Sequence, residues 1–239
     1  MTVLGCSGTY PGPGGACSGY LVRSPGTTVV VDLGSGTLAN LQRHVGLGDV
    51  DALVLSHEHP DHWLDLPLLR NALRYVLDLG DLPVYGTAGT RSQARALIGE
   101  LEPTLVWHTI TGGSTATVGD LSLRFSATDH PVETLAVRAD RNGRSLLYSS
   151  DTGPAWRGQG VDGDIDAFVC EATFAPTEEG RHQHLSARQA GTLADRVGAR
   201  RLVLTHMPPG VEPADQRRRA SAAFAGPIAL ATTGAVFVV

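Results

Sequence analysis

The sequence predicts an α/β fold in which two sheets pack face to face and helices lie outside. Two observations lead to this prediction. Short segments rich in Val and Leu alternate with segments whose leucines recur every three or four residues. This plan of strands followed by helices also occurs twice along the 239 residues. No Pro/Ser-rich linker, charge block or low-complexity tract separates the halves, so we expect residues 1–239 to form a single domain.

The first half begins with strands that Gly, Pro and Ser turns separate, and it continues with helices that carry an apolar face. Within the helix expected over residues 64–79, Leu66, Leu69, Leu73 and Val76 have core spacing. In chain order, we expect strands at Thr2–Gly5, Gly19–Arg23 and Thr27–Asp32, a helix at Gly36–Val45, a strand at Asp51–Leu55, a helix at Leu64–Leu79, a strand at Pro83–Tyr85 and a helix at Thr90–Leu101.

The second half repeats this order with short apolar or alternating strands and two further helices. Ser186 has the residue type and position of a helix N-cap. In chain order, we expect strands at Leu121–Ser126, Thr134–Ala139, Ser145–Ser149 and Ala167–Cys170, a helix at Ser186–Val197, a strand at Arg201–Thr205, a helix at Pro213–Phe224, and strands at Ile228–Ala231 and Ala235–Val239.

The composition excludes several function classes. With 42% hydrophobic residues the chain can bury a large core. Lysine is absent and all 19 basic residues are arginines, which excludes a lysine nucleophile, a Schiff base and a lysine phosphate clamp. The net charge of −5 argues against a broad nucleic-acid surface. A small anionic substrate is still compatible, because divalent metals would reverse the local field.

The cysteines and the chain start indicate a cytoplasmic protein. Cys6, Cys17 and Cys170 are odd in number, and the first residues lack the pattern of a secretory signal. No apolar stretch reaches membrane-spanning length, so we expect no membrane partner. Cys6 and Cys17 lack the tight spacing of redox or metal motifs, and we expect reduced thiols.

Three histidines and two acids lie within six residues, directly after the apolar run Asp51–Leu55, in the segment Ser56-His57-Glu58-His59-Pro60-Asp61-His62. The cluster therefore stands where a strand ends, a usual place for a site on an α/β sheet. Imidazole and carboxylate without thiolate suit zinc, manganese or iron. A structural histidine needs only one or two hydrogen-bond partners, so a metal site explains this density better than a solvated turn.

Polar residues follow three strands of the second half in the same way. His130, Asp151 and His206 each come just after an expected strand. Taken singly, each has a simpler explanation as a cap or as a histidine held by hydrogen bonds. Together with the first cluster, they indicate one site at the strand ends.

These residues, in this order, resemble the ligand set of the metallo-β-lactamase superfamily over nearly the whole chain. The resemblance implies a four-layer αββα sandwich within the α/β class. It also implies two divalent metal ions, with zinc as the first candidate and manganese or iron as alternatives. One metal would be held by His57, His59, His130 and Asp151, and the other by Asp61, His62, Asp151 and His206, so that Asp151 bridges both.

Within the superfamily, three local features resemble the phosphodiesterase branch that includes tRNase Z. These are Ser150-Asp151-Thr152-Gly153-Pro154, Glu171-Ala172-Thr173-Phe174 and His184-Leu185-Ser186. Four further segments resemble small bacterial cyclic-nucleotide phosphodiesterases: Leu4-Gly5-Cys6-Ser7-Gly8, Ser18-Gly19-Tyr20-Leu21, Leu64-Asp65-Leu66-Pro67 and Leu204-Thr205-His206-Met207-Pro208-Pro209. In tRNase Z a long tRNA-gripping arm separates the third histidine from the bridging aspartate. Here we expect only a hairpin that turns at Arg141-Asn142-Gly143-Arg144.

The resemblance implies in-line attack on a small phosphodiester, foremost a cyclic nucleotide, by a hydroxide held between the metals. Asp61, His184 and Glu171 are the candidate catalytic residues: we expect His184 to protonate the leaving group and Glu171 to orient it. The simpler alternative for His184 is a surface histidine near a helix start. Trp63 and Trp156 flank the ligand segments and could stack on a base or serve as packing.

Other functions stay open as alternatives. They are a tRNase Z-like endoribonuclease without the arm, a thiolester hydrolase of the glyoxalase II type, and a metal-binding sensor without turnover. The absence of an export signal and of a cysteine at a metal position argues against a true β-lactamase. The expected partner is a small-molecule phosphodiester rather than a nucleic acid, and the sequence leaves a homodimer open.

Overall fold

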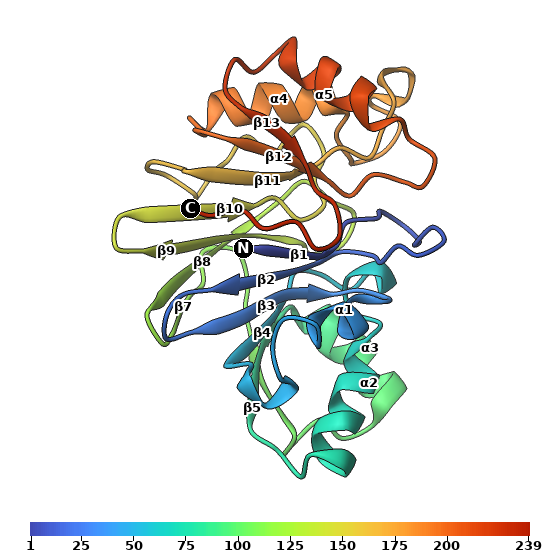
Figure 1. Ribbon diagram of the computed structural model, residues 1–239, viewed down its shortest axis with the longest axis vertical. Coiled ribbons are helices and arrows are strands. Elements are labelled where there is room, and N and C mark those ends of the chain that lie inside the picture. Colours follow the sequence, from blue (N-terminus) through green and yellow to red (C-terminus); the bar gives the residue numbers. More distant parts are fainter. The chain divides into compact units, whose positions relative to one another are not determined.

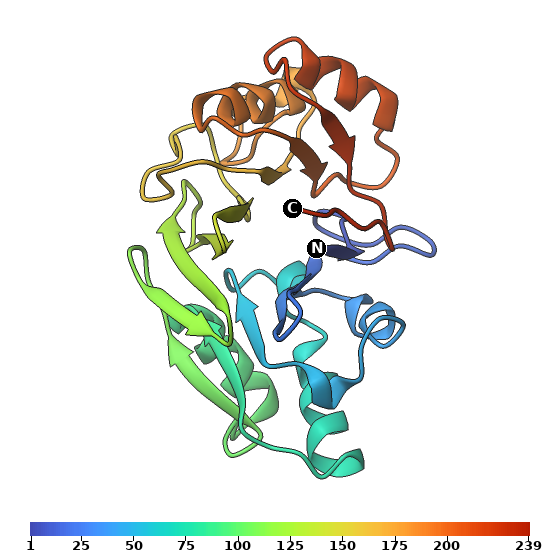
Figure 2. The same ribbon diagram turned by 60° about the vertical axis from the view of Figure 1, so that its left-hand side comes forward.

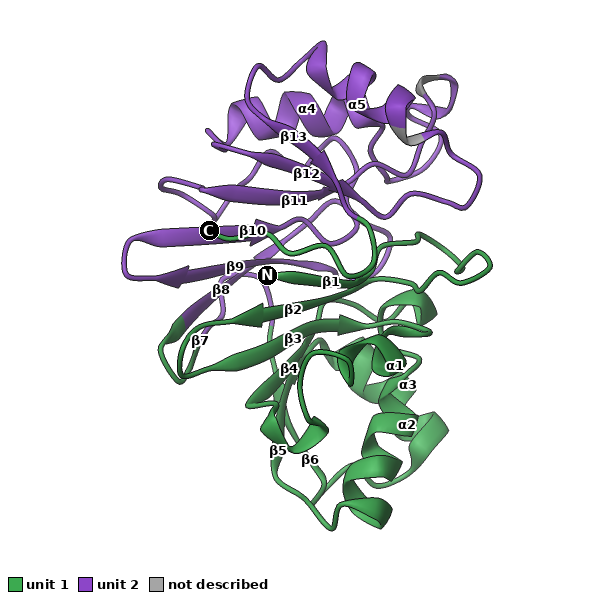
Figure 3. Cartoon of the chain, in the orientation of Figure 1, with its two compact units in different colours: residues 1–110, 117–121, 232–238 green, residues 111–116, 122–231, 239 purple. Residues whose placement is uncertain are grey.

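The computed structural model describes residues 1–175, 177–212 and 214–239. The chain divides into two compact units (Figure 3). Unit 1 comprises residues 1–110, 117–121 and 232–238, and unit 2 comprises residues 111–116, 122–231 and 239. The expectation of a single domain stays a prediction. None of the described helices is long and apolar enough to cross a membrane.

A six-stranded mixed sheet in the order β1-β2-β3-β4-β5-β6 forms the framework of unit 1 (Figure 1). β1, β2 and β3 pair antiparallel, and β3 to β6 run parallel. The strands are β1 (Thr2–Gly5), β2 (Gly19–Arg23), β3 (Thr28–Leu33), β4 (Ala52–Leu55), β5 (Leu82–Gly86) and β6 (Leu105–Thr109). The helices are α1 (Thr37–Leu41), α2 (Leu66–Asn71) and α3 (Ala88–Ile98).

The core of unit 1 lies between its sheet and these helices, and it contains Leu53 of β4, Leu69 of α2 and Ala94 of α3. The expected helix over residues 64–79 is wrong in its continuity, because a π-helical segment, Ala72–Val76, follows α2. Leu73 is buried, as its spacing predicts. The wider π-helical turn changes the helical register after it, so Val76, which we expect in the core, is 78% exposed.

A seven-stranded mixed sheet in the order β13-β12-β11-β10-β9-β8-β7 forms the second framework. β10 to β13 run parallel, whereas β8, β9 and β10 pair antiparallel. The strands are β7 (Thr115–Val118), β8 (Leu121–Ala127), β9 (Leu135–Arg141), β10 (Arg144–Tyr148), β11 (Ala167–Glu171), β12 (Leu202–Thr205) and β13 (Ile228–Leu230). Short 3₁₀ turns occur at Leu47–Asp49, Pro60–His62 and Pro176–Glu178.

Two helices, α4 (Ala187–Arg196) and α5 (Pro213–Ser221), lie side by side in unit 2 (Figures 1 and 2). The first residue of the expected helix at Pro213–Phe224 lies outside the described residues. Ser186 is the N-cap of α4, as predicted, and it forms a capping box with Gln189. The core of unit 2 contains Phe168 of β11, Leu193 of α4 and Ala220 of α5.

The connection between β9 and β10 is a tight hairpin, as predicted. Arg141 pairs with Arg144, and both Asn142 and Gly143 have positive φ, as a two-residue turn requires. The chain therefore reaches Asp151 from His130 without any inserted arm.

Three further segments differ from the sequence predictions. β6 and β7 were not expected, and residues 235–239 do not form a strand. The C-terminal segment pairs with the start of the chain through an isolated bridge between Thr2 and Val236. Backbone hydrogen bonds join Val3 N to Ala235 O, Gly234 N to Val3 O and Phe237 N to Met1 O. Val236 and Val238 are exposed, so the apolar alternation in this segment does not mark a buried strand.

A close approach of α4 to α5 leads to a prediction about stability. A Cβ on Gly191 would lie 2.5 Å from the backbone oxygen of Ala220, so α5 would have to move. We expect Gly191→Ala to lower the free energy of unfolding by about 1–3 kcal/mol, although alanine favours helix more than glycine does. Thermal denaturation would measure this change. Gly26→Ala is the matched control, because a Cβ there meets nothing within 4 Å. Equal stability of the two variants would contradict the predicted crowding.

Candidate active site

Three of the predicted site residues of unit 2 end or follow strands that run parallel. β10, β11 and β12 are neighbours, with Tyr148 level with Val169 and Glu171 level with Thr205. Asp151 follows β10, Glu171 ends β11, and His206 follows β12. The carboxyl ends of parallel strands meet at one edge of the sheet, and that edge brings these side chains together.

Non-glycine residues with positive φ occur near the ends of three strands, one in unit 1 and two in unit 2. Asp32 at the end of β3 has φ 58°, Ser150 after β10 has φ 53°, and His206 after β12 has φ 57°. This region is unfavourable for residues with a Cβ, and such residues concentrate at functional sites. The backbone therefore turns sharply just where the polar side chains begin.

In unit 1, Asp32 organises the loop that follows β4. Its fully buried carboxylate accepts hydrogen bonds from the backbone N–H of Ser56 at 2.8 Å and from the Ser56 hydroxyl at 2.9 Å. Its Oδ2 also lies 2.7 Å from Nδ1 of His62. A carboxylate can only accept, so Nδ1 of His62 carries the proton and Nε2 is the nitrogen suited to bind a metal.

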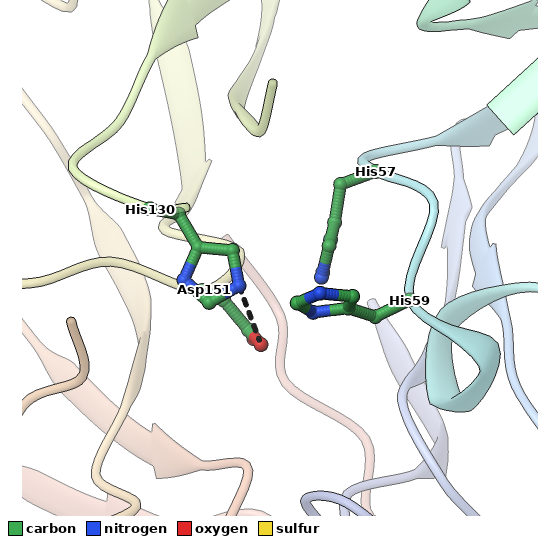
Figure 4. A group of neighbouring side chains, drawn as sticks. All are labelled: His57, His59, His130 and Asp151. Atoms are coloured by element: carbon green, nitrogen blue, oxygen red, sulfur yellow. Dashed lines mark ion pairs between the residues drawn. The ribbon is translucent and has the colours of Figure 1, made fainter. Parts of the chain in front are cut away.

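The remaining members of the unit 1 cluster lie close to His62. The ring centroid of His57 is 4.1 Å from that of His62 and 4.8 Å from that of His59 (Figure 4 draws His57 and His59). Oδ2 of Asp61 accepts a hydrogen bond from the Thr9 N–H at 2.8 Å and lies 3.6 Å from Nε2 of His62. The loop thus gathers imidazole and carboxylate groups within unit 1.

Glu58, which stands between two predicted ligands, lies against the start of α3. A Cβ on Gly89, in the first turn of that helix, would lie 1.7 Å from its Oε2. A carboxylate is favoured near a helix N-terminus. The backbone oxygen of Glu58 also accepts a hydrogen bond from the Trp63 indole at 2.9 Å. Glu58 therefore anchors the loop to the scaffold of unit 1.

In unit 2, the two oxygens of Asp151 lie near different histidines. Oδ1 is 3.3 Å from Nε2 of His206, and Oδ2 is 3.9 Å from Nε2 of His130 (Figure 4, dashed line). Nδ1 of His130 lies 3.1 Å from the backbone oxygen of Gln183, which can only accept, so Nε2 is again the suitable ligand atom. This placement of Asp151 suits a carboxylate that bridges two cations.

Glu171 is the centre of a hydrogen-bond network in unit 2. Its fully buried carboxylate accepts from the Thr152 N–H at 2.6 Å and the Leu185 N–H at 3.2 Å. It also accepts from the Thr173 hydroxyl at 2.7 Å, and that hydroxyl oxygen lies 2.8 Å from Nδ1 of His206. Because the Thr173 hydroxyl donates its proton to Glu171, its oxygen can accept a hydrogen bond from the Nδ1–H of His206. Glu171 thereby orients His206 through Thr173.

The same carboxylate holds His184. Nδ1 of His184 lies 3.0 Å from Oε1 of Glu171, and the His184 ring stacks on His206 at 5.7 Å between centroids. Asp151, His184 and His206 each offer a ligand atom within 4.8 Å of one another. His184 is therefore no isolated surface histidine, and it lies next to the predicted ligands of unit 2.

The donor chemistry of these side chains fits divalent metals. Imidazole nitrogens and carboxylate oxygens suit zinc, manganese and iron. In His62, His130 and His206, the Nδ1 atom contacts a carboxylate, a carbonyl and a hydroxyl oxygen, respectively. These contacts leave Nε2 of each ring as the atom suited to bind a metal. Such outer contacts orient the rings of metal-binding histidines and raise their basicity. The structure thus carries a candidate His/Asp metal site.

The cysteines and tryptophans contribute to packing. The three cysteines form no disulfide. Burial raises the pKa of both the Cys6 and the Cys17 thiols to about 11, so both stay protonated near neutral pH. Trp63 and Trp156 are each 4% exposed and belong to the two cores, which supports the packing interpretation over base stacking.

Two residues that position the site are not among those predicted from the sequence. The sequence predicts Asp32 only as the end of a strand, although it shares the strand-end placement that identifies His130, Asp151 and His206. Thr173 lies in one of the motifs, but its role depends on a contact with His206, 33 residues away. The strand-end pattern could have identified Asp32, but no local pattern identifies Thr173.

The network predicts the effect of Glu171→Gln. Each oxygen of Glu171 accepts from one backbone N–H, Thr152 on Oε1 and Leu185 on Oε2. Either orientation of the substituted amide would therefore place its NH₂ against a backbone donor. We expect a loss of about 1–3 kcal/mol in the free energy of unfolding, measured by denaturant titration. Unchanged stability would contradict the assigned hydrogen bonds. Gln159→Glu is the control, because it exchanges an amide and a carboxylate at an exposed loop position outside this network. We expect it to leave the free energy of unfolding nearly unchanged.

Comparisons with known proteins agree with this arrangement. Residues 27–207 match the family described as Beta-lactamase superfamily domain. The uncharacterized protein Rv1339 of Mycobacterium tuberculosis is 38% identical over 242 residues, covering 95% of this chain and 88% of that protein. Ribonuclease Z of Mycolicibacterium gilvum is 29% identical over 249 residues, covering 90% of this chain and 86% of that protein.

A Bacillus subtilis protein described as "Probable metallo-hydrolase YhfI" is 31% identical over 248 residues, covering 99% of this chain and 98% of that protein. The crystal structure of this metallo-beta-lactamase fold protein superposes with a TM-score of 0.91 at 29% identity, covering 99% of this chain and 97% of that chain. The family match, these relatives and the His/Asp site together show that the chain belongs to the metallo-β-lactamase superfamily, in the metallo-hydrolase branch that includes tRNase Z.

Proposed function

We propose that the chain is a metal-dependent phosphodiesterase that hydrolyses small phosphodiesters, with a cyclic nucleotide as the first candidate substrate. One observation carries this proposal. Glu171 holds the ring of His184 by Nδ1, next to Asp151 and His206. This arrangement offers an imidazole that can deliver a proton beside a metal site, as cleavage of an ester with a poor leaving group requires.

The proposed metal ligands are the set that the family resemblance implies. His57, His59, His130 and Asp151 would hold one ion, and Asp61, His62, Asp151 and His206 the other. Two divalent ions would polarise a phosphoryl oxygen and supply a nucleophile near neutral pH. Zinc is the first candidate, with manganese or iron as alternatives. The spacing of the Asp151 oxygens from His130 and His206 supports the bridging role of Asp151.

The remaining side chains have defined tasks in this proposal. His184 donates a proton to the leaving oxygen, and Glu171 keeps the His184 ring in place and stabilises its protonated form. Glu171 also orients His206 through Thr173, so one buried carboxylate positions both a ligand and the proton donor. Asp32 has the corresponding positioning role for His62 in unit 1.

Two features favour a small substrate over tRNA. The β9–β10 hairpin turns in two residues, where the arm of tRNase Z would be inserted. The net charge of −5 does not favour a long polyanion, because nucleic-acid binding depends on neutralising many phosphates. We accordingly propose a small-molecule partner. The three cysteines, which form no disulfide, support activity in a reducing compartment, and we propose the cytoplasm.

A substrate panel tests the proposal. We expect metal-loaded protein to hydrolyse cyclic mononucleotides and a generic aryl phosphodiester, with little action on precursor tRNA or a glutathione thiolester. Product formation is followed by chromatography with chelator-treated protein as control. Efficient, site-specific trimming of precursor tRNA without cyclic-nucleotide turnover would favour the nuclease alternative. Preferential thiolester cleavage would favour a glyoxalase II-type enzyme.

The role of His184 has a separate test. We expect His184→Ala to lower kcat on a nucleotide ester by about 10²- to 10⁴-fold, the usual effect of removing a general acid. The loss on a nitrophenyl phosphodiester should be much smaller, because that leaving group is stable without a proton. Metal content should not change. His182→Ala, at an exposed neighbouring histidine, is the matched control.

Two outcomes would contradict this role. Equal losses on both substrates would indicate that His184 binds the phosphate instead of protonating the leaving oxygen. Loss of metal from the His184→Ala protein would place His184 among the ligands.

A further inference from the structure

Unit 2 contains a pocket that the proposed reaction does not use. Its volume is about 260 Å³, and it lies between one face of α4 and the segment that begins at Pro154. Arg188, Thr192 and Arg196 line it from α4 at positions i, i+4 and i+8, which lie on one side of a helix. Arg157 lines it from the facing segment.

Three arginines therefore line one small pocket in a chain whose net charge is −5. Arg188 forms an ion pair with Glu179 at 2.5 Å. Arg157 and Arg196 form no ion pair with any described residue. Two positive charges at the pocket thus lack a carboxylate counterion within the described part of the chain.

The other walls of the pocket are apolar. Trp156, Leu185 and Leu193 line it, and all three are buried members of the unit 2 core. A site with an apolar base and a few directed charged groups is typical of small-molecule binding. The volume lies just below the range of roughly 300–1,000 Å³ usual for such sites, so it suits a small ligand rather than a polymer.

We propose that this pocket binds a small organic phosphate, with the phosphate held by Arg157 and Arg196 and the carbon part against Trp156 and Leu193. Guanidinium groups recognise phosphate through paired hydrogen bonds, and the chain has no lysine for this purpose. The phosphate site is separate from the metal ligands of unit 2, because α4 and the residues after Pro154 supply its lining.

The pocket is connected to the candidate active site by two short segments. Pro154 follows Asp151 by three residues. Leu185 follows His184, and its N–H donates to Oε2 of Glu171. A ligand in the pocket therefore contacts the segments that hold the Glu171–His184 pair. Binding itself requires neither metal nor turnover, so it is independent of the proposed function.

Isothermal titration calorimetry with phenyl phosphate tests the proposal on the full chain, in its metal-loaded form and after chelation. We expect one site per chain after chelation. The same site should persist in the metal-loaded form, where the metal centre can bind a second phosphate. Phenyl phosphate should bind more tightly than inorganic phosphate, and phenol should not bind. The double variant Arg157→Gln/Arg196→Gln should weaken binding at least tenfold.

The control Arg43→Gln/Arg217→Gln removes the same charge at exposed positions outside the pocket, and it should bind as the wild type does. Thr192→Phe keeps every arginine but fills the cavity, and it should also abolish binding. Three results would overturn the proposal: no binding to the wild type, a double variant that binds within twofold of the wild type, or binding that is lost on chelation. The last result would place the anion at the metal centre.

Discussion

The hydrogen bonds accepted by two buried carboxylates determine the geometry of the site. Asp32 in unit 1 and Glu171 in unit 2 are fully buried, and burial of an ionised acid is costly unless donors surround it. Ser56 and His62 supply those donors to Asp32, and Glu171 accepts from four groups, two of them backbone N–H. The same bonds that offset the cost of burial fix the orientation of the histidine rings.

This arrangement explains why the site occurs at the strand ends. Parallel strands bring Asp151, Glu171 and His206 to one edge of the second sheet, and the turns at Ser150 and His206 adopt positive φ just there. Such strained residues persist only where their surroundings determine them, and here the buried strands supply that support. These hydrogen bonds fix the positions of the polar groups, and polar groups fixed in this way lower the reorganisation that a reaction requires.

Most of the fold could be predicted from the sequence, because buried strands leave strong local signals. β1, β2 and the N-cap of α4 follow from apolar runs, turns and the side chain of Ser186. β7 escaped prediction because Thr115–Val118 is short and mostly exposed, so its strand depends on pairing with β8. The exposure of Val76 likewise results from a π-helical turn that a regular helical period does not indicate.

For the candidate site, local motifs predict which residues take part but not every contact between them. His184 and Glu171 lie in contact, whereas the link from Glu171 to His206 through Thr173 depends on long-range packing. Metal counting tests the central claim most directly, namely that the site holds two ions that share Asp151. Inductively coupled plasma mass spectrometry should find two equivalents of divalent metal in the wild-type chain and the loss of at least one in Asp151→Ala. Retention of both equivalents in a folded Asp151→Ala protein would contradict the account.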